Sequence, residues 1–287
     1  MTQPTDEERR ALDELLTSLD LEPLGDDRFR GPIHQREGRL FGGLILAQAV
    51  MAAGRTATKG DIHSLHAYFL RGGKPAIPVD YQVERIREGR TFITRRVTAI
   101  QGGDVIFEAS VGYTLPEPGI SHQAPMPAAP DPEGQPTWWE TLMRTPVPRR
   151  MRWINPVDIR TAEFKDEARG ERLPSRAVWT RVVGQLLDDP HIHAAMMAFM
   201  SDSGLVGTVA NSYGLWNERN TSASLDHAIW WHRPPRFDDW ILYTSESPAA
   251  HNARALIFGA MYTRDGVRVA SVAQEGLFRE LKPGEQR

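Results

Sequence analysis

A sequence pattern that returns at a constant spacing restricts the fold of this chain more than any other feature. The segment around His66 resembles the segment around His227, and 161 residues separate the two histidines. The same spacing aligns three other places: Ala109 to Val111 with Ala270 to Val272, Asp104 with Asp265, and Gly43-Leu44 with Gly204-Leu205. Because unrelated segments rarely align at separated places in one register, we interpret the chain as an internal duplication.

Hydrophobic periodicity predicts the same order of elements in each copy. A first amphipathic helix is expected over Asp6 to Leu19, and a helix that is apolar on all sides over Phe41 to Gly54. From Asp61 onward the period changes to two, which indicates strands. In the first copy they are expected over 62–70, 79–83, 91–100 and 105–115, and in the second over 157–164, 178–183, 223–231, 240–247, 253–263 and 267–277.

The second copy is predicted to carry its own buried helix over Ile192 to Ala210. The two copies are separated by a stretch that holds nine of the 21 prolines, at positions 116, 118, 125, 127, 130, 132, 136, 146 and 148. Such a density excludes regular helix and central strand. We therefore expect an N-terminal repeat over residues 1–118, a connector over 119–155 and a C-terminal repeat over 156–287, in the α+β class, with two antiparallel sheets each wrapped around a central helix.

Composition excludes several classes of function. The 287 residues include no cysteine, which excludes disulfides, thiolate metal sites and a cysteine nucleophile, and which fits a cytoplasmic location. The net charge of −3 gives no overall attraction to nucleic acid. The longest apolar run, Gly42 to Gly54, is too short to cross a membrane, and the acidic N-terminus is unlike a secretory signal. A Gly-x-Ser-x-Gly elbow and the glycine patterns of nucleotide-binding loops are absent.

Several separated motifs resemble the type II acyl-CoA thioesterases. In chain order these motifs are Phe29-Arg30-Gly31, Phe41-Gly42-Gly43, His63 to Arg71, Asp226 to Pro234, and Gln274-Glu275-Gly276. The resemblance spans about residues 10 to 280, and it implies a tandem hot-dog fold. It also implies an enzyme of lipid and fatty acid metabolism that hydrolyses acyl-CoA to a free acid and CoA, without a metal or an organic cofactor.

The resemblance also implies a catalytic set. The family's aspartate falls on Asp202, its hydroxyl residue on Ser224, where threonine is more usual, and its glutamine on Gln274. Asp202 is expected to activate a water molecule that Ser224 and Gln274 orient. Subtracting 161 from these positions gives Phe41, His63 and Tyr113, so we expect one active site per chain, formed by the second copy and walled by the first.

Other residues are candidates for substrate binding or for a structural role, on weaker sequence patterns. A backbone N–H at Gly42 or Gly43, or one at the second central helix, is a candidate donor to the thioester carbonyl. Arg149 and Arg150, in a cluster with Arg144 and Arg152, are candidates for the CoA phosphates, as is the pair Arg95-Arg96, with solvated surface charge as the alternative reading. Because both copies carry the histidine of the repeated segment, His66 and His227 are expected to be structural.

Alternative functions remain open at this point. The hot-dog fold also hosts hydratases, so an enoyl-CoA hydratase-like enzyme is one alternative, and a non-catalytic module that binds acyl-CoA or lipid is another. A homo-oligomer, a dimer or tetramer, is expected because paired hot dogs associate through their exposed faces. The sequence leaves the acyl chain length and the pathway open.

Overall fold

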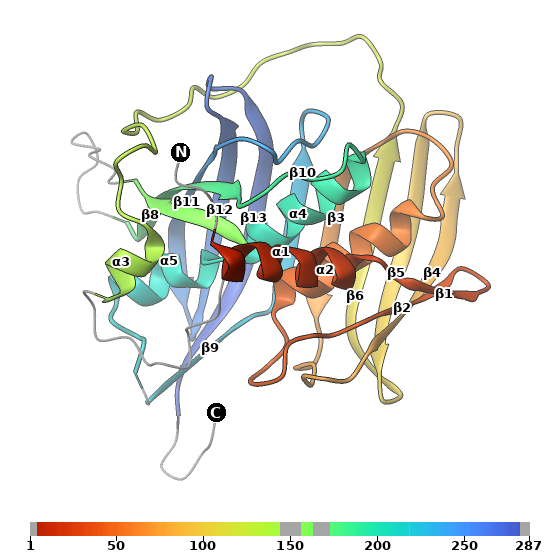
Figure 1. Ribbon diagram of the computed structural model, residues 1–287, viewed down its shortest axis with the longest axis horizontal. Coiled ribbons are helices and arrows are strands. Elements are labelled where there is room, and N and C mark those ends of the chain that lie inside the picture. Colours follow the sequence, from red (N-terminus) through yellow and green to blue (C-terminus); the bar gives the residue numbers. More distant parts are fainter. Residues whose placement is uncertain (1–4, 144–155, 163–172, 218, 282–287) are drawn as a thin grey trace.

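The computed structural model describes residues 5–143, 156–162, 173–217 and 219–281 (Figure 1). The N-terminal half contains, in order, α1 (Asp6–Leu19), β1 (Glu22–Gly25), β2 (Arg28–Gly31), α2 (Gly42–Gly54), β3 (Asp61–Phe69), β4 (Val79–Glu88), β5 (Phe92–Gln101) and β6 (Asp104–Thr114). The predicted first helix has the predicted bounds, and a Thr5–Glu8 capping box satisfies its first backbone amides.

The C-terminal half repeats this order of elements, with one more helix after its central helix and one more short strand. After α3 (Trp138–Met143) come β7 (Val157–Thr161), β8 (Ser175–Val182), α4 (Pro190–Asp202), α5 (Leu205–Ser212), β9 (Asn220–Ser224), β10 (Asp226–Trp231), β11 (Ile241–His251), β12 (Arg254–Thr263) and β13 (Arg268–Glu280). The strands predicted from alternation are found within a few residues of their expected ends, except that the run 223–231 is interrupted at Leu225.

The strands of the two halves form one continuous antiparallel sheet. Its order is β1-β2-β4-β5-β6-β3-β10-β13-β12-β11-β8-β7, with β9 added beside β13. The two halves meet where β3 pairs with β10, with Ala228 opposite His66. The two predicted sheets are therefore joined edge to edge, and the sheet curves around the helices in Figure 1.

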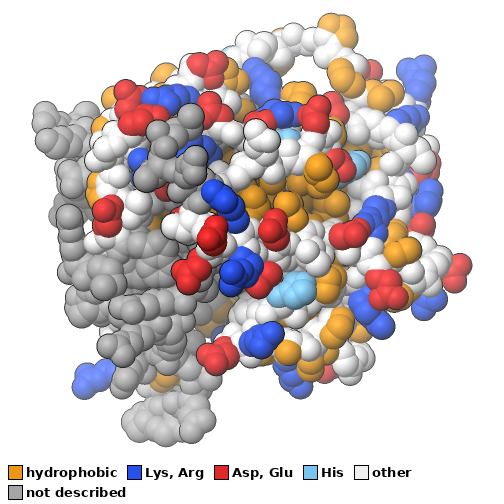
Figure 2. All heavy atoms as spheres, viewed as in Figure 1, with side chains coloured by type: hydrophobic (Ala, Val, Ile, Leu, Met, Phe, Trp, Pro, Cys, Tyr) orange, Lys and Arg blue, Asp and Glu red, His pale blue; other side chains and the backbone are white. Residues whose placement is uncertain are grey.

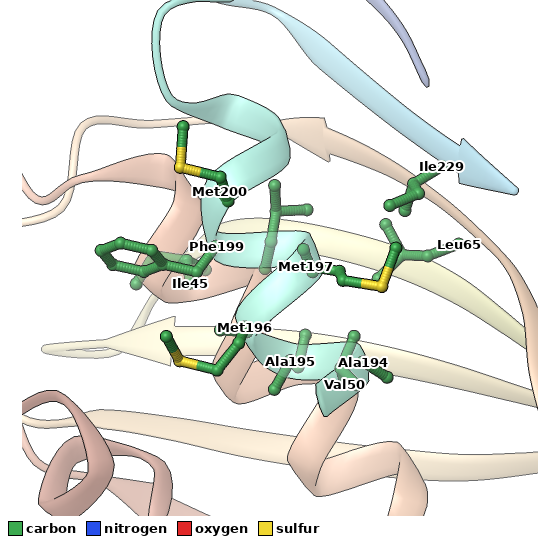
Figure 3. Packing of buried hydrophobic residues seen from close by; sticks show 14 of the residues in the cluster. Ile45, Val50, Leu65, Ala194, Ala195, Met196, Met197, Phe199, Met200 and Ile229 are labelled. Atoms are coloured by element: carbon green, nitrogen blue, oxygen red, sulfur yellow. The ribbon is translucent and has the colours of Figure 1, made fainter. Parts of the chain in front are cut away.

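Two central helices, α2 and α4, lie in the hollow of the sheet and run antiparallel to each other. A Cβ added at Gly43 would lie 2.4 Å from the carbonyl oxygen of Phe199, and one at Gly54 would lie 2.7 Å from Nδ1 of His191. Glycine is required at Gly43 because the helix backbones approach so closely there, and at Gly54 the absent side chain leaves room for the His191 ring. Figure 3 shows Ala194 and Ala195 of α4 beside Val50 of α2.

The second central helix is shorter than predicted. The sequence predicted one helix over Ile192 to Ala210, whereas α4 ends at Asp202 and α5 begins at Leu205. Gly204 between them has φ +85°, a left-handed conformation that ends α-helices and that other residues adopt only with strain. The break leaves the carboxylate of Asp202 at the end of a buried helix instead of in its middle.

The proline-rich stretch covers the outer face of the C-terminal half of the sheet. Trp179 of β8 donates from Nε1 to the carbonyl oxygen of Pro130 at 2.7 Å, and Met126 and Ala129 pack on a small second core around it. Gln123 bonds the backbone of Gly266 and Arg268. The described part of the predicted connector is thus a structural layer. The expectation that it contains no regular helix is wrong, because α3 forms in the proline-free interval between Pro136 and Pro146.

The first helix is held over the central pair by one buried amide. Nε2 of Gln48, in α2, donates to the carbonyl oxygens of Ser18 at 2.7 Å and of Pro32 at 3.0 Å, and Oε1 accepts from the hydroxyl of Tyr81 at 2.7 Å. The buried amide thus meets three partners, as its desolvation demands. In the described part of the chain, none of the helices is both long enough and apolar enough to span a membrane.

Candidate active site

The strand registers correct the spacing between the two copies. β3 has a register shift between Ile62 and Ser64, and the matching break between β9 and β10 falls at Leu225, which is 162 positions after His63. A second shift follows Ala99 in β5 and Met261 in β12, again 162 positions apart. The alignment at 161 is therefore wrong by one residue in these strands. Because side chains alternate along a strand, a slip of one residue exchanges the two faces of the sheet.

This correction separates the two histidines that the sequence had paired. His66 is exposed and lies directly opposite Ala228, its true counterpart, whereas His227 is only 1% exposed and corresponds to Leu65. The two histidines therefore do not occupy equivalent positions, as the alignment at 161 had implied. His227 is a buried polar side chain that the first copy lacks, so its hydrogen-bond partners show what it does.

The structure brings together the three residues that the resemblance implies. Ser224 donates from Oγ to Oδ1 of Asp202 at 3.0 Å, and Nε2 of Gln274 donates to Oγ of Ser224 at 2.9 Å. Asp202 comes from the end of α4, Ser224 from the end of β9 and Gln274 from β13. Because Ser224 immediately precedes the strand break at Leu225, its side chain is re-aimed toward the helix end, a common use of a bulge beside a site.

The hydrogen-bond chain continues into the core through His227. Its Nδ1 lies 2.6 Å from Oε1 of Gln274, and its Nε2 lies 2.8 Å from Oγ of Ser201. Burial lowers the pKa of His227, while the neighbouring Asp202 and Gln274 oppose this shift, so the ring is neutral near pH 7 with one N–H. The sequence did not predict that His227 joins this hydrogen-bond chain, although His227 follows Leu225 by two residues.

Proton positions along this chain follow from its two ends. A carboxylate only accepts, so Ser224 must donate to Asp202, and Gln274 must then donate to Ser224. The amide oxygen of Gln274 accepts from Nδ1–H of His227. Oγ of Ser201 lies 2.8 Å from both Nε2 of His227 and the carbonyl oxygen of Ala198, and its one hydrogen serves one of these two acceptors at a time. From His227 onward all the bonds point toward Asp202, so His227 determines which way the amide of Gln274 is turned.

The first copy has no counterpart of this polar set. The β5–β6 hairpin is one residue shorter than the β12–β13 hairpin, so β6 and β13 correspond at a spacing of 163 and Gln274 matches Val111. Ser224 matches Ile62, and Asp202 matches Gly54, since each ends a 13-residue central helix. The counterparts expected from the sequence, Phe41, His63 and Tyr113, are replaced by Gly54, Ile62 and Val111. The prediction that only the second copy holds the polar residues is kept.

The candidate site opens into a cavity of about 1100 Å³ between the two halves. Asp202 and Ser224 line it from the second half, and α1, the loop before α2 and the start of α2 line it from the first. In Figure 2 acidic and basic side chains alternate over the middle of this face, where α1 runs in Figure 1. Gln274 is fully buried and does not line the cavity, so it reaches the cavity only through Ser224.

The two glycines predicted to bind substrate have different surroundings. A Cβ at Gly42 would lie 2.8 Å from Oδ2 of Asp202 and 2.9 Å from the ring of Phe69, and Gly42 lines the cavity. Gly43 instead contacts the backbone of Phe199, so its absent side chain serves helix packing. Gly42 begins α2, where backbone N–H groups have no partner within the helix and carry partial positive charge.

Of the arginines predicted to bind phosphate, the structure describes only Arg95 and Arg96. Arg149 and Arg150, like Arg144 and Arg152, lie outside the described residues. Arg95 is fully buried, where it donates to the hydroxyl and carbonyl oxygens of Thr56 and pairs with Glu88, so it is structural and the phosphate reading is wrong for it. Arg96 pairs with Glu84 on the outside of the sheet. Neither Arg95 nor Arg96 lines the cavity.

Comparison with known proteins identifies the family. Residues 149–277 match the family model described as acyl-CoA thioesterase, and residues 30–114 match the acyl-CoA thioesterase N-terminal domain. The chain is 37% identical to acyl-coenzyme A thioesterase 8 of Mus musculus, across 94% of this chain and 90% of that protein. It is 33% identical to acyl-CoA thioesterase 2 of Haemophilus influenzae, across 93% of this chain and 98% of that protein.

Solved structures agree with these sequence relationships. The crystal structure of the acyl-CoA thioesterase II TesB2 from Mycobacterium marinum has a TM-score of 0.80 and 38% sequence identity, covering 95% of this chain and 99% of that one. A hot-dog protein from Alicyclobacillus acidocaldarius has a TM-score of 0.77 at 19% identity, covering 94% of this chain and 99% of that one, and supports the fold alone. The tandem hot-dog fold predicted from the sequence is confirmed, and the chain belongs to the type II acyl-CoA thioesterase family.

Proposed function

We propose that this chain hydrolyses acyl-CoA thioesters to a carboxylic acid and CoA, with Asp202 as the base that activates water. The observation that carries the proposal is the hydrogen-bond chain from His227 through Gln274 and Ser224 to Oδ1 of Asp202. It leaves Oδ2 of Asp202 for a water molecule in the cavity, 2.8 Å from where a side chain at Gly42 would begin.

The reaction proceeds in one displacement by water. Oδ2 of Asp202 accepts a proton as the water oxygen forms a bond to the thioester carbon, and the carbonyl oxygen becomes an oxyanion. The oxyanion then re-forms the carbonyl, the carbon–sulfur bond breaks, and the proton held by Asp202 passes to the departing sulfur. A positioned base contributes roughly 10²–10⁴-fold to such a step.

Ser224 and Gln274 have unequal roles in this scheme. Oγ of Ser224 uses its one hydrogen on Asp202 and accepts from Gln274, so one lone pair remains for the attacking water. Gln274 is fully buried and therefore orients the water through Ser224 instead of touching it. His227 is a positioning residue, because it acts through the amide of Gln274.

The oxyanion is assigned to the N-terminus of α2. Gly42 lines the cavity beside Asp202 as the first residue of α2, and helix N-termini stabilise negative charge. Gly43 is a weaker candidate because it packs against α4. The missing side chain at Gly42 allows the thioester carbonyl to reach the helix end.

Asp202→Asn tests the base directly. Asparagine has the same shape and still accepts from Ser224, but it cannot take the proton, so we expect kcat to fall at least 10²-fold while the melting temperature stays within a few degrees. CoA release from a panel of acyl-CoA esters measures turnover with a thiol reagent, and the chain has no cysteine to react with that reagent. Turnover within threefold of the unchanged protein would remove Asp202 from the mechanism.

The same panel separates the alternative functions. A binding module would bind acyl-CoA in calorimetry but release no CoA. A hydratase-like enzyme would consume the double bond of an enoyl-CoA, which its ultraviolet absorbance reports, and would leave the thioester intact. The cytoplasmic location and the homo-oligomer stay predictions, tested by fractionation of the source cells and by light scattering of the purified protein.

A further inference from the structure

One wall of the active-site cavity carries three arginines that the proposed chemistry does not use. Arg36 and Arg39 lie in the loop before α2, and Arg71 follows β3; all three are exposed and line the cavity. None of the three pairs with a described carboxylate, whereas Arg30, Arg85 and Arg95 each do. We call Arg36, Arg39 and Arg71 the arginine wall.

The loop that carries the arginine wall is fixed by a single amide. Nε2 of Gln35 donates to the carbonyl oxygens of Glu37 at 2.8 Å and Arg39 at 2.6 Å, and its Oε1 accepts from the N–H of Phe41 at 3.1 Å. One side chain thus closes the loop on itself just before α2 begins. Such support holds a binding loop in one shape before the ligand arrives.

Arg71 is brought to the same wall by contacts between the two loops. The N–H of Leu40 donates to the carbonyl oxygen of Gly73 at 3.2 Å, and a Cβ at Gly72 would lie 3.8 Å from Cδ of Arg39. Arg71 itself donates from Nη1 to the carbonyl oxygen of Val105 at 2.7 Å, which orients its guanidinium and leaves its other N–H groups for a ligand.

The charge on this wall is positive and local. Among the residues that line the cavity, the two loops contribute the three arginines and one glutamate, Glu37, whereas α1 contributes Glu7, Arg10 and Glu14. The positive charge is therefore concentrated in the two loops, outside the catalytic end of the cavity. Guanidinium groups suit phosphate because their N–H donors match its oxygens in pairs.

Distance along the chain relates this wall to the candidate catalytic residues. Arg39 is three positions and Arg36 six positions before Gly42, so their Cα atoms lie within about 10 Å and 20 Å of Gly42 at full extension. CoA carries its diphosphate at the far end of the pantetheine arm from sulfur. Because the arginine wall and Asp202 line one cavity, a single substrate can contact both, with its thioester at Asp202 and its phosphates at the wall.

We propose that the arginine wall binds the phosphate groups of the CoA nucleotide, which deepens the proposed function and rests on it. The predicted phosphate residues Arg149 and Arg150 lie outside the described residues, so the proposal adds residues of the first copy to that prediction. In this scheme the second copy supplies the base and the residues that orient water, and the first copy supplies the helix N-terminus for the oxyanion and holds the nucleotide end of the substrate.

The test compares two substrates that differ only in the nucleotide. Hexanoyl-CoA and hexanoyl-pantetheine present the same thioester, but the second has no phosphate. We expect Arg36→Ala and Arg39→Ala each to lower kcat/KM for the CoA ester about tenfold, mainly through KM, since a charge-assisted hydrogen bond is lost at an exposed site. For the pantetheine ester the change stays within twofold.

Arg90→Ala is the matched control, because Arg90 is exposed in the β4–β5 turn, has no described ion pair and does not line the cavity. It should leave both substrates unchanged. Equal losses on both esters in Arg36→Ala or Arg39→Ala would overturn the proposal. Such losses would mean that the arginines act on the hexanoyl-pantetheine part, which both esters share and which carries no phosphate. An unchanged kcat/KM for the CoA ester would overturn it as well.

Calorimetry keeps this test independent of turnover. Free CoA should bind the Arg36→Ala/Arg39→Ala double variant at least tenfold more weakly than the unchanged protein, and the difference should shrink at high salt. If the unchanged protein hydrolyses neither ester, the proposed function has failed, and the calorimetric comparison alone decides the phosphate site. Equal CoA affinity in the two proteins refutes it.

Discussion

Gly42 is the position where a single methyl group should separate activity from stability. In Gly42→Ala the new Cβ would lie 2.8 Å from Oδ2 of Asp202 and 2.9 Å from the Phe69 ring, whereas ordinary contact begins at 3.4 Å. The carboxylate would therefore have to retreat by about 0.6 Å. The same methyl group would also narrow the cavity at the first residue of α2.

The expected loss follows from that displacement. A misplacement of about 1 Å in a catalytic group can cost roughly 10²-fold, so a shift of this size, together with the narrowed cavity, should lower kcat about 10- to 100-fold. Stability should change little. Alanine is favoured over glycine in a helix by up to about 1 kcal/mol, which offsets the crowding against Phe69.

Two measurements on one preparation decide the point: steady-state CoA release and the thermal unfolding midpoint. Gly207→Ala is the control, since Gly207 is also helical but a Cβ there would meet its neighbours at an ordinary 3.8 Å. We expect full activity in the control and an unchanged midpoint, within a few degrees, in both variants. Gly42→Ala with kcat within threefold of the unchanged protein would show that neither Asp202 nor the helix end is as close to the reacting atoms as we infer.

Two further predictions concern the histidines. His227→Leu introduces the residue found at the equivalent position, Leu65, so the strand should fold, but the amide of Gln274 loses the donor that fixes its orientation. We expect kcat to fall about tenfold with KM unchanged. The control His66→Leu, on the opposite face of the sheet, should have no effect on either constant. Burial also lowers the pKa of four histidines: His63, His193, His227 and His232. Below the unfolded pKa of about 6.5 the unfolded chain binds more protons than the folded chain, so the free energy of unfolding should decrease as pH falls from 7.5 to 5.5. Urea denaturation between pH 7.5 and 5.5 measures the free energy of unfolding. A free energy that stays constant or increases as the pH falls would contradict the lowered pKa of these histidines.

The duplication was visible in the sequence, but its register was not. The alignment at 161 matched identical residues, such as His66 with His227, and identity is a poor guide when two copies have diverged. The bulges at His63 and Leu225 and the burial of His227 placed the copies at 162. Strand faces are set by packing, so only the structure shows which residues of two repeats correspond.

The break between α4 and α5 is a second feature that the sequence did not predict. Ser203-Gly204 has residue types that are common at helix ends, yet the apolar run from Ile192 to Ala210 favours one long helix. Gly204 adopts a left-handed conformation, and Arg176 of β8 donates to the carbonyl oxygen of Ser203 at 3.3 Å. A tertiary contact of this kind is absent from any local pattern, so periodicity could not settle where the helix ends.

What the sequence determined by itself was local or repeated. Periods of two and 3.6 residues and a proline-rich interval fixed the elements and their order, and motif resemblance selected Asp202, Ser224 and Gln274. Only the tertiary structure determined that these residues meet, that His227 extends their hydrogen-bond chain, and that an arginine wall from the other copy borders the same cavity. The physical reason is that alternation and helical pitch act between near neighbours, whereas a site is made where segments distant in sequence pack together.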